Sequence, residues 1–408
     1  MEKIALVIFV LTYIGVAVGF IPGLALDRTG IALLGAIAMV VAGVIDPHHA
    51  IAAIDMPTIL LLYALMVVAA QFRLSGFYTA TALVMTRFLK RPAVFLGMLM
   101  MVVAVLSAVL TNDIICLAFT PVLCATLIEA HLNPVPFLLG LACASNIGSA
   151  LTIIGNPQNM LIGQVGRLSF SQFTAFCTIP AVVSLIAAYL LIALLYRNRF
   201  VLVRLPDILE RRHDWPRYNH RQAVKGLIVT GLLLGMFFTP VPREVSSLAA
   251  AGVLLCSRKM RTRSMLGLVD WHLITLFCAL FIVIASIERV GIPDNLMGGL
   301  WRLGIQLHHP ASLTFITAAL STMVSNVPAT ILLVKFLSTN DPMQWYIVGL
   351  AGTFAGNLIT IGSIANLIVI EAAQPYGIHI GFKEHARVGI PVTMISFMVL
   401  LGWIGVNR

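Results

Sequence analysis

Charged residues are scarce in this chain, and their scarcity excludes most soluble proteins. Asp, Glu, Lys and Arg make up 10% of the 408 residues, whereas hydrophobic residues make up 60% and the mean hydropathy is +0.99. Soluble domains carry roughly 25% charged residues. Apolar stretches of about 20 residues, the length that a helix needs to cross a bilayer, recur along the chain. The composition therefore predicts an all-α polytopic membrane protein.

Cysteine is also sparse, and its spacing argues against a site built from thiols. The six cysteines lie in apolar segments without a Cys-x-x-Cys pair, so we interpret them as small buried residues and expect no disulfides. No nucleotide-binding Gly–Lys loop, catalytic-triad signature or zinc motif occurs. His48, His49, His308 and His309 lie in predicted loops, where nothing else completes a metal site. We therefore expect no enzyme activity, no cofactor and no bound metal.

The net charge of +10 does not indicate a nucleic-acid partner, because the basic residues flank the apolar stretches. Positive charge in such loops determines how a membrane protein is oriented. One set of loops holds 19 of the 26 Lys and Arg residues, and the opposite loops and termini hold 6. The basic loops are 23–29, 72–92, 197–225, 258–271 and 371–387. We expect them in the cytoplasm, with both termini outside and the protein in the inner (plasma) membrane.

Two kinds of polar interruption recur in the apolar sequence. The triplet at 111–113 (Thr-Asn-Asp) lies between two apolar arms, and 325–327 (Ser-Asn-Val) lies between two more, 214 residues later. Each is followed by a break in a later apolar segment, at 155–159 (Gly-Asn-Pro-Gln-Asn) and at 362–366 (Gly-Ser-Ile-Ala-Asn). Helix-breaking residues at membrane depth are tolerated only where they are buried in protein or line a cavity. A matched pair of such breaks indicates the substrate site of a secondary transporter.

The interruptions belong to an internal repeat of the whole chain. Other landmarks match at an offset of 215, for example Asp55 with Asp270. One register that holds across several landmarks favours duplication over chance. We therefore predict a first repeat at 1–196, a basic cytoplasmic linker at 197–222 and a second repeat at 223–408.

Each repeat has the same predicted order: three spans, a re-entrant hairpin, a broken helix and a last span. In the first repeat these lie near 4–22, 30–45, 57–72, 93–130, 136–165 and 174–196. In the second repeat they lie near 223–241, 245–257, 272–287, 311–337, 343–370 and 388–405. Five spans per repeat, about ten in all, place the two repeats in inverted orientations. The alternative to each hairpin is two ordinary helices joined by a loop.

Asp113 is the main candidate for ion coupling. A carboxylate within a transmembrane segment indicates a functional site. At a hairpin tip, held partly out of water, it can exchange a proton or hold Na⁺ together with carbonyl oxygens. Thr111 adds a hydroxyl at the same tip. The alternative is that Asn112 and Asp113 cap a helix at 114–130, and the two roles are compatible.

Amide and hydroxyl side chains at the tips and breaks are the predicted substrate ligands. Amides donate and accept hydrogen bonds, so this lining suits a small hydroxylated solute or an oxyanion. The predicted ligands are Asn112, Asn156, Asn159, Ser325, Asn326, Ser363 and Asn366. Gly155, Pro157 and Gly362 interrupt the helices, and local helix capping is the alternative role for any single Asn. Lys335 lies about 13 Å along a hairpin arm from Asn326, so we expect it to reach the membrane interface instead of the site.

These motifs resemble a known superfamily. Segments 145–149 and 155–160, preceded by Asn112 and Asp113, resemble the ArsB/NhaD permeases of the ion transporter superfamily, and plant silicic acid efflux carriers are similar in this stretch. Segments 356–359 and 362–367 resemble the second-half counterpart. The resemblance covers nearly the whole chain. It implies scaffold and transport subdomains, elevator-type alternating access, often a homodimer, and for ArsB-type permeases it allows a cytoplasmic ATPase partner.

The resemblance also leads to a hypothesis about the substrate. The sodium–dicarboxylate branch carries Ser-Asn-Thr at both tips, and both tips here lack the final Thr, which argues against a dicarboxylate. The ArsB branch exports arsenite and antimonite, which near neutral pH are mostly uncharged hydroxides. We therefore expect proton-coupled efflux of such a solute through a protein surrounded by membrane lipids. The alternatives are a Na⁺/H⁺ antiporter and a sodium-coupled anion or dicarboxylate transporter.

Overall fold

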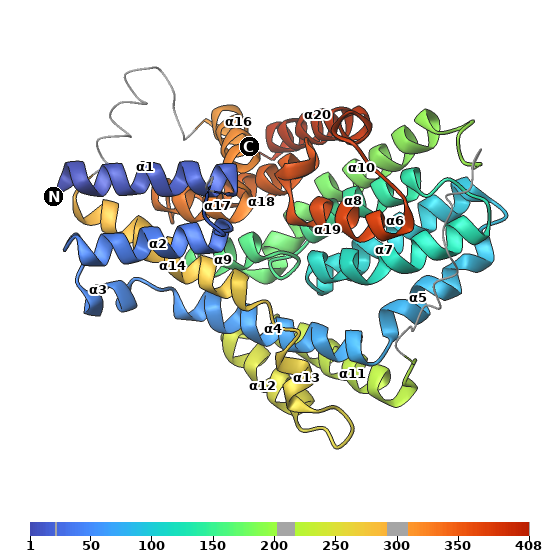
Figure 1. Cartoon of the computed structure of the whole chain (residues 1–408), viewed down its shortest axis with the longest axis horizontal. Coiled ribbons are helices and arrows are strands. Elements are labelled where there is room, and N and C mark those ends of the chain that lie inside the picture. Colours follow the sequence, from blue (N-terminus) through green and yellow to red (C-terminus); the bar gives the residue numbers. More distant parts are fainter. Residues whose placement is uncertain (21–22, 202–216, 292–308, 408) are drawn as a thin grey trace.

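The computed structural model of the chain describes residues 1–20, 23–201, 217–291 and 309–407, which form helices and no β-strand (Figure 1). Within these residues, six helices are long and apolar enough to cross a membrane. They are Met56–Leu74, Pro92–Val109, Asn112–Glu129, Phe170–Leu195, Trp271–Arg289 and Phe382–Val406. Shorter apolar helices lie between them. The prediction of an all-helical polytopic membrane protein is confirmed.

The same order of helices occurs twice along the chain. The first series is α1 Glu2–Val18, α2 Arg28–Val41, α3 Pro47–Ala52, α4 Met56–Leu74, α5 Phe77–Met85, α6 Pro92–Val109, α7 Asn112–Glu129, α8 Val135–Ser149, α9 Pro157–Val165 and α10 Phe170–Leu195. The second is α11 His220–Met236, α12 Arg243–Leu255, α13 Thr262–Leu266, α14 Trp271–Arg289, α16 Pro310–Val324, α17 Asn326–Leu333, α18 Pro342–Ala355, α19 Ile364–Ala373 and α20 Phe382–Val406. Thus α1–α4 correspond to α11–α14, and α6–α10 correspond to α16–α20.

Equivalent helices also begin in the same way. Asp55 precedes α4, and its Oδ1 accepts a hydrogen bond from the Thr58 amide at 2.9 Å. Asp270 precedes α14, and its Oδ1 accepts one from the Leu273 amide at 2.9 Å. Both bonds satisfy an amide that has no partner within its own helix. The repeat therefore extends from the sequence to the details of local structure.

The packing between the two series is exchanged. Helix α4 packs against α12, and its equivalent α14 packs against α2; likewise α7 packs against α19, and α17 packs against α9. Such an exchange is what an approximate two-fold relation between the series produces. Helices α8 and α18 lie at the centre and are buried almost all round, as expected for helices without a polar face. The two helix breaks follow directly on these central helices.

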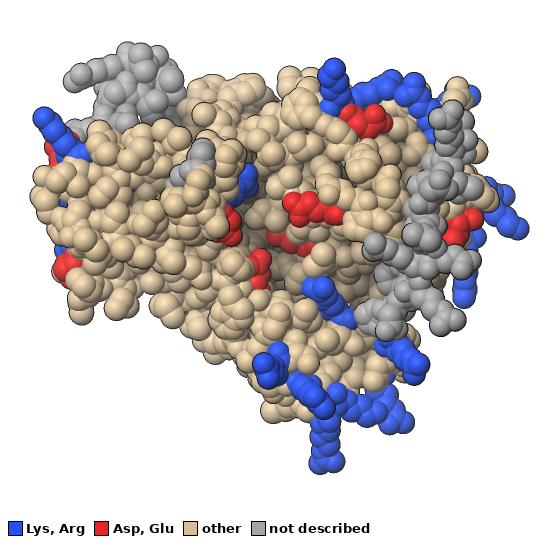
Figure 2. Space-filling view, viewed as in Figure 1, with Lys and Arg blue, Asp and Glu red and all other residues tan. Residues whose placement is uncertain are grey.

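The charged residues are distributed unevenly over the surface. Figure 2 shows Lys and Arg gathered at the lower and right-hand edges of the view, while acidic side chains gather around a hollow near its middle. The lower edge contains the α12–α13 loop with Arg258, Lys259, Arg261 and Arg263, and residues 86–91 after α5 add Arg87, Lys90 and Arg91. We call the part of the molecule that carries these two basic segments, at the lower and right-hand edges of the view, the basic end.

Three details differ from the sequence predictions. His48 and His49 lie in the short helix α3 and not in a loop, because Asp46 caps the His49 amide at 3.1 Å and Pro47 occupies the first turn. Cys256 ends α12 and is exposed, so not every cysteine is buried. Helix α11 begins at His220, inside the predicted linker at 197–222. Residues 202–216 of that linker lie outside the described part of the chain, as does His308.

Candidate functional site

The two hairpin tips and the two helix breaks meet at one small cavity, which we call the tip cavity. Its lining residues are Asn112, Asp113, Asn156, Pro157, Gln158, Leu273, Ser325, Asn326, Val327, Ser363 and Ile364. All except Leu273 belong to a tip or a break, and Asp113 is the charged residue among them. The cavity measures about 30 Å³, room for one or two water molecules. The sequence interruptions that lie far apart in the chain are therefore neighbours in the fold.

Each helix break is stabilised by an asparagine in the half-helix that follows it. Asn159 Nδ2 donates to the carbonyls of Ser149 at 3.3 Å and Thr152 at 3.1 Å. In the second half, Asn366 Nδ2 donates to the carbonyls of Gly356 at 2.7 Å and Ile359 at 3.3 Å. The last carbonyls of a helix have no partner in that helix, so these bonds allow it to stop inside the protein.

The residue that caps each half-helix also reaches the central helix of the other half. Asn156 caps α9 by accepting from the Asn159 amide at 2.8 Å, and its Nδ2 donates to Thr353 Oγ1 of α18 at 3.2 Å. Ser363 caps α19, and its Oγ donates to Asn146 Oδ1 of α8 at 2.9 Å. These crossed bonds connect both breaks into one hydrogen-bonded network.

Both hairpin tips contact the break of their own half. The Asn112 backbone amide donates to the Gly155 carbonyl at 3.3 Å. The side-chain amide of Asn326 is 3.2 Å from the Gly362 carbonyl and donates to it when its nitrogen faces that oxygen. Ser325, between α16 and α17, has φ 75° and ψ 160°, a conformation that is strained for any residue except glycine. The second tip is therefore the strained one.

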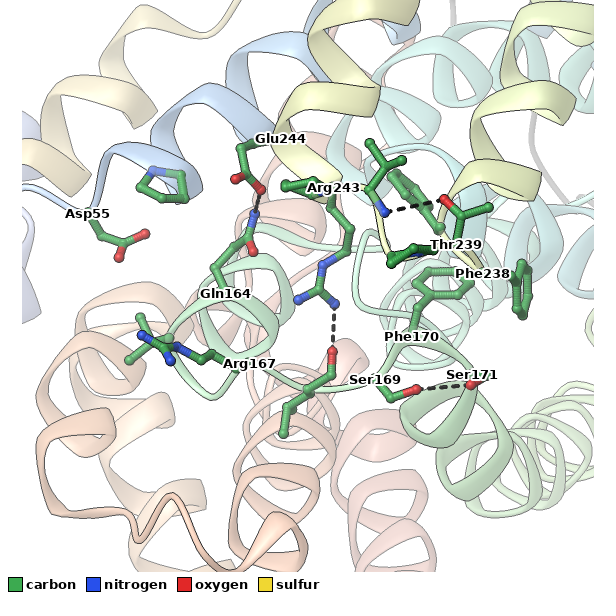
Figure 3. A pocket seen from close by; sticks show the side chains of 17 residues that line it. Asp55, Gln164, Arg167, Ser169, Phe170, Ser171, Phe238, Thr239, Arg243 and Glu244 are labelled. Carbon is green, nitrogen blue, oxygen red and sulfur yellow. Dashed lines mark hydrogen bonds between the residues drawn. The ribbon is translucent and has the colours of Figure 1, made fainter.

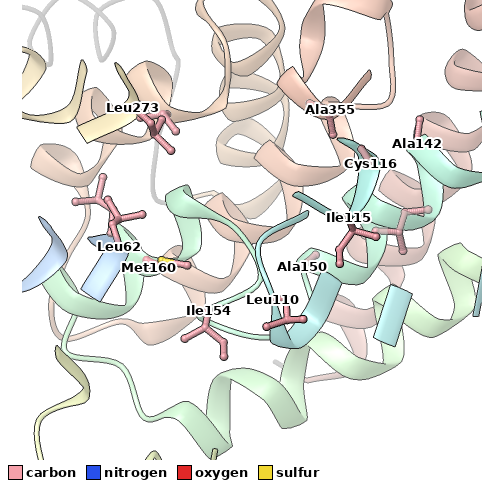
Figure 4. Packing of buried hydrophobic residues seen from close by; sticks show 14 of the residues in the cluster. Leu62, Leu110, Ile115, Cys116, Ala142, Ala150, Ile154, Met160, Leu273 and Ala355 are labelled. Carbon is pink, nitrogen blue, oxygen red and sulfur yellow. The ribbon is translucent and has the colours of Figure 1, made fainter. Parts of the chain in front are cut away.

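Four helix N-termini converge on the tip cavity, since α7, α9, α17 and α19 all begin there. The free amides and the dipole at a helix N-terminus favour negative charge or electron-rich oxygen. Apolar side chains surround these ends: Leu110 and Ile115 flank the first tip, and Ile154 and Met160 flank the first break (Figure 4). The apolar surroundings lower the local dielectric constant and so strengthen these electrostatic effects.

Asp113 does not cap helix α7. Helix α7 begins at Asn112, its N-cap residue is Thr111, and no side chain makes the capping hydrogen bond. The capping alternative for Asn112 and Asp113 is therefore wrong. Asp113 lies in the first turn and accepts no hydrogen bond from the described residues. Its carboxylate is left available for a ligand or a proton.

A second cavity adjoins the first and contains Asp113 as well. We call it the Asp270 cavity; it measures about 130 Å³. Its lining residues are Met66, Arg73, Thr111, Asp113, Ile114, Leu117, Pro157, Leu268, Asp270, Leu273 and Ile368. Asp113, Pro157 and Leu273 line both cavities. Because Leu268 and Asp270 follow α13 at the basic end, the Asp270 cavity lies between that end and the tip cavity.

A larger cavity of about 710 Å³ lies between the start of α4, the α9–α10 turn and the α11–α12 turn. Figure 3 shows the Arg243 side chain at its centre, with Asp55 at one side. Arg243 donates to the carbonyls of Gly163 at 2.6 Å and Leu168 at 2.9 Å, and Gln164 Nε2 donates to Glu244 Oε2 at 3.0 Å. We call it the Arg243 cavity. It contains none of the predicted site residues, and polar contacts between α9–α10 and α12 run beside it.

The structure brings most of the predicted site residues together, but not all of them. Asn112, Asp113, Asn156, Pro157, Ser325, Asn326 and Ser363 line the tip cavity, and Thr111 lines the Asp270 cavity. Asn159, Asn366, Gly155 and Gly362 line neither cavity and build the breaks instead. Lys335 lies outside the site, where its Nζ pairs with Glu288 Oε2 at 2.8 Å.

Sequence reasoning missed several polar residues of this region. Gln158 lines the tip cavity, and its Nε2 donates to Thr353 Oγ1 at 2.6 Å. Asn146 Nδ2 donates to Asn357 Oδ1 at 2.9 Å and to Asn366 Oδ1 at 3.1 Å. When α8–α9 is aligned with α18–α19, Asn146 and Thr353 occupy equivalent positions. A search for polar residues at equivalent places in the two central helices would have found both.

Comparison with known proteins places these features in context. A family model described as CitMHS, citrate transporter, matches residues 4–351. The "46 kDa membrane protein" of Mycobacterium leprae is 27% identical, over 97% of this chain and 96% of its own length. The silicon efflux transporter LSI3 of Oryza sativa is 24% identical over 94% of each chain. The putative transporter arsB of Dictyostelium discoideum is 20% identical, over 92% of this chain and 87% of its own.

The fold also occurs in a solved structure. The YdaH transporter of Alcanivorax borkumensis, whose crystal structure is described as having an unusual topology, superposes with a TM-score of 0.52. The match covers 98% of this chain and 95% of that one, at 14% sequence identity. At this identity the likeness concerns the fold alone.

Proposed function

The chain belongs to the citrate transporter family CitMHS, whose members are membrane transporters and not enzymes, and on this premise we propose a function for it. We propose that it is a secondary active antiporter that couples proton entry to efflux of a small uncharged hydroxide of a metalloid. Arsenite and antimonite are the expected solutes. Silicic acid has the same hydroxylated, uncharged character, and one relative is named a silicon efflux transporter.

The chemistry of the tip cavity carries this proposal. Its described lining residues offer amides, hydroxyls and one carboxylate, and no Lys or Arg. Amides and hydroxyls both donate and accept hydrogen bonds, so they match a solute whose surface consists of hydroxyl groups. The cavity measures only about 30 Å³, so a solute of a few heavy atoms requires a smaller rearrangement of its lining than a large one does. Citrate, with three carboxylates, would need compensating positive charge.

Asp113 supplies the coupling in this proposal. It lies in both the tip cavity and the Asp270 cavity, so a proton bound to this carboxylate at the solute site can be released toward the basic end. If proton and solute occupy the site in turn, each return step of the protein carries one or the other, and the result is antiport. The four helix N-termini stabilise the unprotonated carboxylate while the solute is bound.

The alternating step is proposed to move the tips and breaks as one body. The tips bond to the breaks through Asn112 and Asn326, and the breaks bond to α8 and α18 through Ser363 and Asn156. A body connected in this way can slide against the remaining helices, which is the elevator movement that the superfamily resemblance implies. The two inverted repeats proposed for the whole chain are residues 1–196 and 223–408. The exchanged packing between the two series of helices supports that division.

An anion such as citrate is the second candidate, and one observation favours it. Four helix N-termini around a single cavity provide positive potential without any basic side chain. Asp113 in the same cavity opposes an anion, because a carboxylate beside a carboxylate costs free energy. A Na⁺/H⁺ antiporter remains the third candidate.

The proposal includes an orientation and partners. The basic end faces the cytoplasm of a cell whose inner membrane holds the protein, and both termini lie outside. Lipids surround the apolar helices. A homodimer and a cytoplasmic ATPase partner are compatible with the superfamily resemblance.

A solute screen on the purified protein tests the function. Proteoliposomes are loaded with arsenite, antimonite, silicic acid, citrate or Na⁺, and solute flux is measured with and without an imposed pH gradient. We expect saturable efflux of arsenite or antimonite that the pH gradient accelerates and a protonophore abolishes. Citrate flux driven by Na⁺ or protons, without metalloid flux, would replace the proposal by its second candidate.

A further inference from the structure

The geometry points to a second carboxylate in the coupling site. We propose that Asp270 acts with Asp113 and the Thr111 hydroxyl to bind one monovalent cation, a proton carried by water or Na⁺. This inference rests on the proposed function, because it concerns the ion that the transporter uses. It adds a residue that lies outside both tips and both breaks and that belongs to a different part of the fold.

The two carboxylates share a cavity although they come from distant parts of the chain. Asp113 lies in the first turn of α7, and Asp270 precedes α14. Both line the Asp270 cavity. Asp270 is exposed and Asp113 half-buried, so the pair runs from the surface at the basic end to the tip cavity.

A buried hydroxyl without a partner lies in the same cavity. Thr111 is 5% exposed, and its Oγ1 makes no hydrogen bond with the described residues. A buried hydroxyl that finds no partner costs about 1–3 kcal/mol, so folded proteins rarely leave one idle. Hydroxyl and carboxylate oxygens are the groups that hard monovalent cations and hydronium prefer. The Thr111 hydroxyl is therefore free to bind a ligand in the cavity that this residue lines.

The side chains that line the Asp270 cavity carry a net charge that one positive charge would neutralise. Its described lining contains two carboxylates, Asp113 from α7 and Asp270 from the α13–α14 turn, and one guanidinium, Arg73 from α4. The segments that contribute Pro157 and Ile368 bring no charge to it. The sum is one uncompensated negative charge, which a single proton or Na⁺ neutralises. A divalent cation would leave the cavity positive.

Helix capping is the competing role for Asp270, and the repeat provides its control. Asp55 occupies the equivalent position and makes an equivalent capping bond at the same length. Only Asp270 Oδ1 takes part in its capping bond, and no described residue bonds to Oδ2. Asp55 lines the Arg243 cavity and not the tip or Asp270 cavity, and the residue equivalent to Asp113 in the second tip is Val327. Capping is thus common to both aspartates, whereas a place beside Asp113 is particular to Asp270, since the carboxylate that shares a cavity with Asp55 is Glu244.

The two carboxylates come from different parts of the fold, so whether they lie together depends on the conformation of the protein. In the proposed elevator movement Asp113 travels with the first hairpin tip, whereas Asp270 stays at the start of α14, which packs against α2. The pair is therefore complete only while the tip lies against α14. Cation binding to the pair favours that conformation, because a ligand shifts an equilibrium toward the state that binds it better.

Cation jumps on proteoliposomes adsorbed to a solid-supported membrane test the site without any metalloid. The currents recorded after a jump in pH or in Na⁺ concentration report the charge displaced when the cation binds. The variants are Asp270→Asn and Asp55→Asn, and both keep a residue that caps helices well. Asp270→Ser, another capping residue, takes the place of Asp270→Asn if that variant does not yield folded protein.

We expect Asp270→Asn to move the half-maximal response by about one pH unit toward acid, or to require about tenfold more Na⁺. The Asp55→Asn response should match the unmodified protein, and the cation that evokes the current identifies the coupling ion. Equal responses of Asp270→Asn and the unmodified protein would overturn the inference, as would equal defects in both variants, which would show that the response does not depend on the place beside Asp113. The absence of any displaced charge in the unmodified protein would overturn it too. Metalloid transport is not needed for this readout, so failure of the proposed function would be seen separately in the flux screen.

Discussion

Asn159 and Asn366 make equivalent pairs of hydrogen bonds in the two halves of the chain. Each donates its side-chain amide to two carbonyls at or just beyond the end of the preceding helix, Ser149 and Thr152 in one case and Gly356 and Ile359 in the other. Both side chains are buried. The two breaks therefore depend on one device used twice, and it explains why an amide is needed at these places even though neither residue lines a cavity.

Replacing either asparagine by alanine should destabilise the protein by a similar amount. Asn159→Ala leaves the buried Ser149 carbonyl unpaired, and Asn366→Ala leaves the Gly356 carbonyl unpaired, at a cost of about 1–3 kcal/mol each. The second carbonyl of each pair keeps a bond from a backbone amide, that of Gly155 or Gly362. We expect a melting temperature several degrees lower for both variants, measured in detergent by size-exclusion chromatography after heating. Asn407→Ala is the control, because Asn407 makes an exposed bond to the Trp403 carbonyl. Melting temperatures of Asn159→Ala and Asn407→Ala that agree would contradict this role.

The two break glycines should differ in their tolerance of a methyl group. A Cβ at Gly155 would lie 2.2 Å from the Ser149 carbonyl oxygen, a clash with backbone that cannot move aside. A Cβ at Gly362 would lie 3.2 Å from the Gly356 carbonyl oxygen, a contact that small shifts relieve. We expect Gly155→Ala to lower the melting temperature and the transport rate much more than Gly362→Ala.

Gly402 provides the matched control for this comparison, because a Cβ there meets nothing within 4 Å. Gly402 lies inside α20, where alanine favours the helix, so Gly402→Ala should be neutral or slightly stabilising. Equal losses in Gly155→Ala and Gly362→Ala would show that the first break is not packed as tightly as described.

Relief of strain at the second tip should stabilise the protein. Ser325 is held at φ 75° and ψ 160°, which costs about 1–3 kcal/mol for a residue with a side chain. Ser325→Gly removes this cost, whereas Ser325→Ala keeps it and removes only the hydroxyl. We expect a higher melting temperature for Ser325→Gly than for Ser325→Ala, and reduced solute affinity in both. A lower melting temperature for Ser325→Gly than for Ser325→Ala would mean that the tip is not strained.

Much of the fold could be predicted from the apolar segments and the interruptions between them. The hairpin predicted at 93–130 is α6 followed by α7, and its ends lie within one residue of theirs. The broken segment predicted at 136–165 is α8 followed by α9. Such agreement is expected in a bilayer, because a long apolar segment there must form a helix to satisfy its own backbone hydrogen bonds. The short helix α3 was missed, since six residues show no helical periodicity.

The candidate site was harder to predict where it depends on contacts between the halves. Polar residues inside the interruptions could be found from their position alone, and Asn112, Asp113, Asn156 and Ser363 were. The bond between Gln158 and Thr353 could not, because it joins α9 to a helix of the other half. Asp270 was known only as a landmark of the repeat, and its place beside Asp113 depends on the tertiary fold that brings the first tip and the start of α14 to one cavity. Tertiary packing, which local sequence does not contain, decides such pairs.

The most direct test of the account compares proton-coupled arsenite flux in the unmodified protein with that in Asp113→Asn. Both proteins are reconstituted at equal density, and arsenite exchange is measured with a pH gradient, and without one as an equilibrium exchange. We predict that the gradient accelerates flux through the unmodified protein, and that Asp113→Asn retains exchange but no longer responds to the gradient. An Asp113→Asn protein that still responds fully to the pH gradient would contradict the account, because the coupling would then lie elsewhere.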